Sequence, residues 1–201
     1  MKMKLGIGLY RHMLTPEYFQ FARQCGCTHL IVHLATYYDK QVVTATDENS
    51  NYGAATAKDP IWELDNLLAL KKQAAEYGLD IYGIENFNPA DWYDVLLAGP
   101  KRDEQLEGLK RIIENTSKAG IKAFGYNFSL AGVWGHQKKH AARGGAESTC
   151  FDASLLDINS PIPNGQVWNM TYAPTDGGFM APVSQKELWD RLKYFLDYML
   201  P

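Results

Sequence analysis

The chain has 201 residues, of which 46% are hydrophobic and 21% are charged, as in a soluble globular domain with a sizeable core. The net charge of -3 and the pI near 5.9 give no basic surface for nucleic acid, so we expect no such partner. No apolar run reaches membrane-spanning length, and the apolar run near the N-terminus is too short for a signal peptide. The three cysteines form no disulfide framework, so we expect a cytoplasmic protein without a membrane partner.

Strand-like and helix-like segments alternate along the chain. Short apolar runs predict strands over 4–10, 29–35, 81–86 and 123–128. Caps and helical spacing predict helices over 16–26, 60–78 and 101–119, and a last helix after 184. Thr15 with Pro16 and Asp59 with Pro60 are predicted helix starts, and Ser184 with Glu187 forms a predicted capping box. Three glycines (Gly26, Gly78 and Gly120) are placed to end helices just before the next strand.

This alternation is an internal repeat of βα units, which implies a parallel sheet. Either a doubly wound sheet or a (β/α)8 barrel fits the repeat. The first, third and fourth strands favour the barrel, because one face of each holds small residues ending in a polar group and the other is bulky and apolar. We therefore predict an α/β fold of the (β/α)8 TIM-barrel type with only about four βα units. We expect 1–201 to be the N-terminal half of one barrel domain, with long loops at 36–58 and 129–183.

Four polar residues stand at the ends of the small-residue faces: Tyr10, His33, Glu85 and Asn127. The carboxyl ends of barrel strands form the catalytic rim, so these side chains are expected to converge there. A phenol, an imidazole, a carboxylate and an amide suit recognition of a polyhydroxylated substrate, and the imidazole and carboxylate can move protons. Alternatively, Glu85 and Asn127 satisfy buried polar groups.

The loop after the fourth predicted strand holds further candidates. His136 and His140 have the spacing of two metal ligands on a helix, but Lys138, Lys139 and nearby glycines favour a solvated loop. Arg143 is a candidate for bidentate binding of a substrate carboxylate, and a plain surface arginine is the alternative.

Several motifs, in this order, resemble the mannonate dehydratase family. They are Gly-Ile-Glu-Asn at 83–86, Lys-Arg-Asp-Glu at 101–104, Ala-Gly-Ile at 119–121 and Gly-Tyr-Asn-Phe at 125–128. Gly-Gln-Val-Trp-Asn-Met-Thr-Tyr at 165–172 and Glu-Leu-Trp at 187–189 add to the resemblance, which spans the chain. The resemblance implies a lyase of hexuronate breakdown that converts D-mannonate, a small sugar acid, to 2-dehydro-3-deoxy-D-gluconate with Mn²⁺ or Fe²⁺.

In the family the metal is held by residues of the fifth to eighth strands, so the resemblance implies no metal ligand in this chain and an inactive fragment. It also implies a first-half wall of the site, in which His33 and Glu85 are catalytic. The substrate-binding residues that it implies are Tyr10, Arg11, Tyr126, Asn127, Trp134, His136 and Arg143.

Two other functions remain open on the same scaffold. One is a metal-dependent sugar isomerase or epimerase similar to xylose isomerase, which needs a pair of carboxylates to handle a proton. The other is a non-catalytic sugar-acid binder, including a homo-oligomer in which two half-barrels pair.

Overall fold

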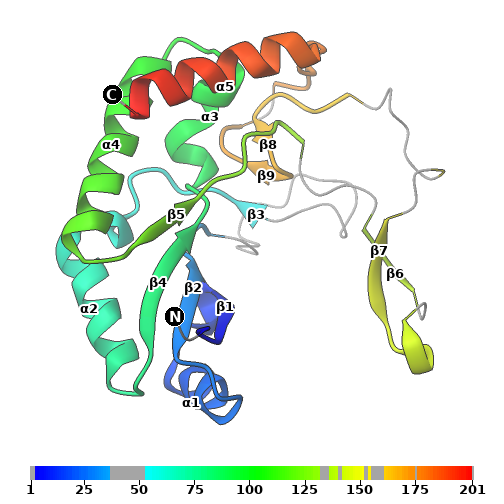
Figure 1. The fold of residues 1–201 in the computed structure, drawn as a ribbon. Helices are drawn as coiled ribbons and strands as arrows, with labels where there is room; N and C mark the ends of the chain where they lie inside the picture. The colour runs from blue at the N-terminus through cyan, green and yellow to red at the C-terminus, as the bar shows by residue number, and fades with distance from the viewer. Residues whose placement is uncertain are drawn as a thin grey trace.

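The strands form one parallel sheet, as the repeat predicts. The computed structural model describes residues 3–36, 53–131, 136–139, 142–151, 154, 161–174 and 176–200. The main sheet has the order β1-β2-β4-β5, with every pair of neighbours parallel (Figure 1). Its strands are β1 (Gly6–Tyr10), β2 (His29–His33), β4 (Asp80–Glu85) and β5 (Ala123–Gly125).

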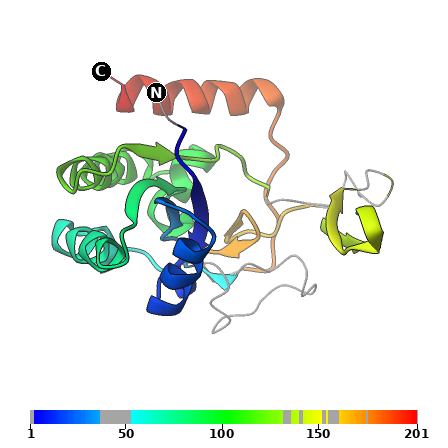
Figure 2. The same cartoon turned by 60° about the horizontal axis from the view of Figure 1, so that its bottom comes forward.

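The long helices pack along this sheet and bury its apolar face. They are α1 (Pro16–Gln24), α2 (Leu64–Ala75) and α4 (Arg102–Lys118), whereas α5 (Gln185–Met199) packs on α4 and on residues 89–97. Figure 1 shows α2 and α4 side by side next to β4 and β5, and Figure 2 shows α5 beside α4. The core between helices and sheet contains Leu9, Leu30, Val32 and Ile84 from the strands, and Leu67 and Leu109 from the helices. Burial of such side chains is the main source of stability in this layer.

The opposite face of the sheet carries the small residues. A Cβ atom at Gly83 would lie 3.2 Å from both Ala123 Cβ and Ile31 Cδ1, so the side chains of three neighbouring strands already fill that level. Such crowding is expected on the inner surface of a small barrel. The predicted alternation fails at one point, because the β2–β4 register shifts between Leu30 and Ile31. As a result Ile81, predicted to face inward, is buried in the same core as Ile84.

Most helix ends follow the predicted signals, although some boundaries of helices and strands differ from the prediction. Gly26, Gly78 and Gly120 have φ of 81°, 70° and 73°, the left-handed region that favours glycine after a helix. Ser184 and Glu187 form the predicted capping box of α5. After Asp59, however, the chain first makes the 3-10 helix η2 (Pro60–Trp62), and α2 begins only at Leu64. The fourth strand ends at Gly125, so 126–128 lie beyond it.

Elements that the sequence did not predict lie near the carboxyl ends of the strands. Helix α3 (Pro89–Leu97) follows β4, capped by the Asn88 side chain. The short strands β3 (Gly53–Ala54), β8 (Gln166–Val167) and β9 (Met170–Thr171) form a second sheet. The antiparallel hairpin of β6 (His136–Lys139) and β7 (Ser148–Phe151) projects away from the main sheet in both views (Figures 1 and 2). Two further 3-10 turns are η1 (Arg11–Met13) and η3 (Arg143–Gly145).

Within the part of the chain that the structure describes, no helix is both long and apolar enough to cross a membrane.

Candidate active site

Three of the predicted residues meet at the carboxyl ends of neighbouring strands. Tyr10 and His33 are register partners at the ends of β1 and β2, and their ring centroids are 4.6 Å apart. Glu85 is the last residue of β4, and its Oε2 lies 3.3 Å from His33 Nε2. Parallel strands in register therefore produce one layer of phenol, imidazole and carboxylate, which is named here the Tyr10–His33–Glu85 layer.

The two titratable groups of this layer differ in exposure. The side chain of His33 is 14% exposed, whereas that of Glu85 is 48% exposed. Burial lowers the pKa of His33 below the ordinary histidine value of 6.5, and the negative charge of Glu85 opposes this shift without overcoming it. A neutral imidazole at neutral pH can donate its Nε2 hydrogen toward Glu85. The carboxylate is then the member of the pair that is open to an incoming molecule.

Arg11, a predicted substrate-binding residue, is held by the protein itself. Its guanidinium group donates to both carboxylate oxygens of Asp59, with Nη2 3.1 Å from Oδ1, and Nη1 also lies 3.5 Å from the carbonyl oxygen of Leu34. Asp59 is buried and also accepts a hydrogen bond from the backbone N–H of Ile61 at 2.9 Å. The ion pair thus fixes the turn that enters η2 against the end of β1. It places a charged group directly beside Tyr10.

The predicted residues after β5 separate in the structure. The ring of Tyr126 packs edge-on against Phe195 of α5, with centroids 5.0 Å apart, although 41% of the residue is exposed. Asn127 is exposed beyond the strand end. The structure therefore does not bring Tyr126 into the Tyr10–His33–Glu85 layer, and the binding roles of both residues stay predictions.

The loop candidates lie apart from the sheet where they are described. Trp134 and His140 fall outside the described residues. His136 begins strand β6, so the helix that a His136–His140 metal pair requires is not formed; the side chain of His136 is not among those described. Arg143 is exposed in η3, at the turn of the β6–β7 hairpin. Its role in binding a carboxylate stays a prediction.

Sequence reasoning missed two polar residues that organise this end of the sheet. The sequence predicts only a helix cap at Asp59, because nothing local indicates that its partner is Arg11, 48 positions away. Asn88 is fully buried, caps α3 through the N–H of Ala90, and donates to Thr36 Oγ1 at 3.3 Å. The dipeptide Asn88-Pro89 was a usable signal for a helix start, since asparagine caps and proline opens helices.

The described residues contain no group of three histidine, cysteine, aspartate or glutamate side chains placed to hold a metal ion. His33 and Glu85 supply only two candidate ligand atoms, and these face one another. The residues at hand therefore do not fit a metal site by themselves, and the location of the expected metal ligands stays a prediction.

Comparison with known proteins agrees with the sequence motifs. The model of the UxuA D-mannonate dehydratase family matches residues 41–201. The chain is 31% identical to a mannonate dehydratase of Streptococcus suis (strain 05ZYH33) over 149 residues, which are 70% of this chain and 40% of that relative. A mannonate dehydratase of Streptococcus pneumoniae (strain 70585) is 30% identical over the same shares of the two chains. The chain thus spans less than half the length of these curated relatives.

A solved structure extends the likeness to the fold. The crystal structure of mannonate dehydratase from Streptococcus suis serotype 2 matches 100% of this chain and 50% of its own, with a TM-score of 0.65 and 25% identity. Together with the parallel sheet, this match confirms the predicted incomplete barrel of the (β/α)8 type. Since the family model covers most of its residues, the chain belongs to the D-mannonate dehydratase (UxuA) family.

Proposed function

We propose that the chain supplies the first part of an active site that converts D-mannonate to 2-dehydro-3-deoxy-D-gluconate. In this dehydration a proton leaves the carbon beside the carboxylate and a hydroxyl leaves the neighbouring carbon. Water is released, and the resulting enol becomes the ketone. The observation that supports the proposal is the Tyr10–His33–Glu85 layer, at the strand ends of a chain that belongs to this family.

The layer has a division of roles in this proposal. Glu85 is the more exposed group, so its carboxylate meets the substrate, where it accepts a hydroxyl hydrogen bond or takes up the proton that leaves carbon. His33 lies behind it and holds the carboxylate through Nε2. Tyr10 packs against the imidazole ring and limits its rotation. The other proposed wall residues are Arg11, Tyr126, Asn127, Trp134, His136 and Arg143.

The reaction also requires stabilisation of the charge that develops beside the carboxylate. Bound Mn²⁺ or Fe²⁺ would supply that stabilisation as a Lewis acid. We propose that its ligands come from the part of the longer relatives that this chain does not span, because the described residues hold no three-ligand cluster.

Two measurements test the proposal. Calorimetric titration with D-mannonate should show binding that Glu85→Gln weakens by about tenfold, the loss of one hydrogen bond to a charged group. Lys118→Met, on the exposed end of α4, is the matched control and should bind like the unchanged chain. Equal affinity of Glu85→Gln and Lys118→Met would contradict the assigned site.

The second measurement concerns the metal ligands. The purified chain with added Mn²⁺ or Fe²⁺ should not consume D-mannonate. Turnover under these conditions would contradict the proposed location of the metal ligands. The role of Glu85 would still be tested by the calorimetric titration with D-mannonate.

A further inference from the structure

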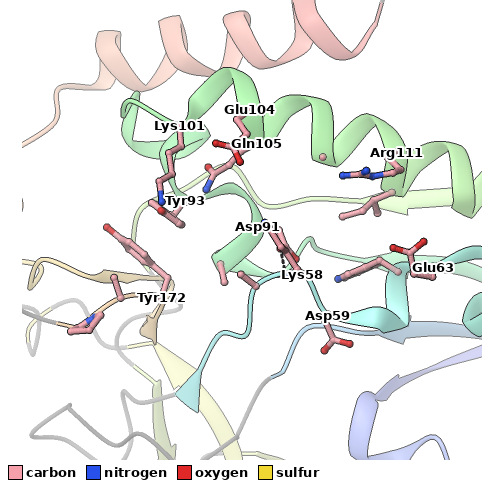
Figure 3. A pocket seen from close by; sticks show the side chains of 17 residues that line it. Lys58, Asp59, Glu63, Asp91, Tyr93, Lys101, Glu104, Gln105, Arg111 and Tyr172 are labelled. Atoms are coloured by element: carbon pink, nitrogen blue, oxygen red, sulfur yellow. Dashed lines mark hydrogen bonds between the residues drawn. The ribbon is translucent and has the colours of Figure 1, made fainter.

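Asp91 carries a carboxyl group that the Tyr10–His33–Glu85 layer does not use. It lies in the first turn of α3, between α4 and the chain that enters η2 (Figure 3). Its Oδ1 accepts a hydrogen bond from the backbone N–H of Lys58 at 2.8 Å, drawn as the dashed line in Figure 3. Its Oδ2 is buried and has no hydrogen-bond partner among the described residues. One oxygen of this carboxyl group is therefore bound, and the other is enclosed without a partner.

No cation neutralises Asp91 within the part of the chain that the structure describes. The charged side chains on the segments around it are Lys58, Asp59, Glu63, Asp94, Lys101, Glu104 and Arg111, and the titratable phenols are Tyr93 and Tyr172. None of these described side chains bonds to Asp91, whose one hydrogen bond comes from the backbone of Lys58. The charge that acts on Asp91 is that of Asp59, which is another anion.

The enclosed oxygen makes ionisation of Asp91 unfavourable. A buried carboxylate oxygen without a partner loses the hydrogen bonds that water would give it, and a neutral acid loses less than an anion. Burial therefore raises the pKa of Asp91, the hydrogen bond from Lys58 opposes this shift, and the charge of Asp59 adds to it. An aspartate in the first turn of a helix is ordinarily ionised, because the helix N-terminus favours a negative charge. Asp91 differs because it is enclosed.

The backbone on both sides of the Asp91–Lys58 hydrogen bond has an unusual conformation. Lys58 has φ of 55°, in the left-handed region that is unfavourable for a residue with a Cβ atom. Trp92, directly after Asp91, has φ of -149° and ψ of 16°, so a kink separates the first turn of α3 from the rest of the helix. A strained residue such as Lys58 keeps its conformation only while its surroundings hold it. Loss of the hydrogen bond would let this turn relax.

We propose that Asp91 is a pH-sensitive latch that holds the turn of Lys58 and Asp59 against α3. When Asp91 carries a proton, its carboxyl group stays enclosed and binds the N–H of Lys58. When Asp91 gives this proton to solvent, the anion moves toward water and the turn is released. Because Asp59 is the partner of Arg11, the latch controls how firmly Arg11 is held beside Tyr10. Low pH closes the latch, and high pH opens it.

Urea unfolding of Asp91→Asn at two pH values tests the protonation. The pKa of Asp91 is raised in the folded protein, so the bound proton stabilises the fold at low pH, and this contribution is lost as the pH rises through that pKa. Asp91→Asn keeps a neutral side chain of similar shape. Its urea midpoint, relative to that of the unchanged chain, should therefore rise between about pH 4.5 and about pH 7.5.

Asp65→Asn is the matched control, since Asp65 is exposed in the first turn of α2. Its relative midpoint should not rise with pH, because the substitution removes a charge that the helix N-terminus favours. A relative midpoint of Asp91→Asn that falls or stays constant with rising pH, as in the control, would overturn the proposal. If Asp91→Asn does not fold, NMR titration of the Asp91 carboxyl group in the unchanged chain decides the question. Ionisation at or below the ordinary value of 3.8 would then overturn the latch, and ionisation above it would support the latch.

Amide hydrogen exchange tests the release of the turn. The informative groups are the N–H of Lys58, bound to Asp91, and the N–H of Ile61, bound to Asp59. After correction for the intrinsic effect of pH, their protection in the unchanged chain should fall by about threefold or more between about pH 5 and about pH 7.5. In Asp91→Asn the corrected protection should be equal at both pH values. Protection that does not change with pH in the unchanged chain would show that Asp91 holds no latch.

Discussion

His33 Nε2 and Glu85 Oε2 face each other across β2 and β4 at 3.3 Å, and burial of the imidazole outweighs the attraction of the carboxylate in setting the pKa of His33. The imidazole is therefore kept neutral beside an anion that is open to solvent. This arrangement gives the pair a fixed hydrogen-bond direction, from His33 to Glu85. It also makes the folded state sensitive to pH.

We expect the free energy of unfolding to fall as the pH drops below 6.5, and the change to be smaller in His33→Gln. The pKa of His33 is lowered in the folded protein, so between that pKa and 6.5 the unfolded chain binds more protons and stability is lost with acid. Urea unfolding at about pH 7.5 and about pH 5 measures the difference. His12→Gln is the control, and identical pH dependence of His33→Gln and the unchanged chain would contradict the lowered pKa.

The pair of Arg11 and Asp59 gives a second prediction. Arg11→Met should lower the free energy of unfolding by about 1–3 kcal/mol, because it leaves the buried Asp59 carboxylate without its charged partner. Arg11→Met combined with Asp59→Asn should recover part of that loss, since the unpaired charge is then removed. Denaturant unfolding of the two single variants and the double variant forms a thermodynamic cycle. A double variant as unstable as the sum of the two singles would show that the residues do not interact.

Helix α5 is fixed to α4 by two tyrosines that donate to carboxylates. Tyr194 Oη donates to Asp103 Oδ1 at 2.9 Å, and the Tyr198 hydroxyl donates to Glu107. The hydrogen bond to Glu107 raises the pKa of Tyr198 to about 12. Its protonated form is therefore favoured in the folded state, and this contribution to stability is lost as the pH rises from 10 through that value.

Titration of phenolate absorbance should detect this tyrosine. The absorbance titration of the unchanged chain minus that of Tyr198→Phe should show one phenol that ionises at a higher pH than an ordinary tyrosine. Glu107→Gln should lower the pH at which that phenol ionises. Tyr194→Phe, which removes the other hydrogen bond from a tyrosine of α5 to α4, serves as the comparison. A difference curve centred at pH 10 would contradict the hydrogen bond.

The end of α3 offers a matched pair of substitutions. Ala98 has φ of 56°, in the left-handed region, so Ala98→Gly should raise the free energy of unfolding by about 0.5–1 kcal/mol. At the next residue the opposite holds, because a Cβ atom on Gly99 would lie 2.0 Å from Asp94 Oδ1. Gly99→Ala should therefore destabilise the chain. Thermal unfolding of both variants checks the pair, and a fall in midpoint for Ala98→Gly would show that the left-handed conformation is not strained.

Much of the barrel scaffold could be predicted from short-range signals in the sequence. The glycines that follow α1, α2 and α4, and the capping box of α5, depend on contacts within a few residues, so the local sequence specifies them. Strand alternation likewise predicted that Tyr10, His33 and Glu85 share one face, because parallel strands in register align their ends. The motifs of the family gave the expected reaction.

Only the tertiary structure decided which partners these residues have. Arg11 pairs with Asp59, the β2–β4 register shift moves Ile81 into the core, and Tyr126 packs on Phe195. A groove beside α3 and α4 likewise combines side chains from separate segments of the chain. Each of these relations joins residues far apart in the chain, and their free energies depend on burial and geometry that no local pattern contains. The sequence by itself determined the repeat and the strand-end residues, and long-range packing determined which of those residues stay open to a ligand.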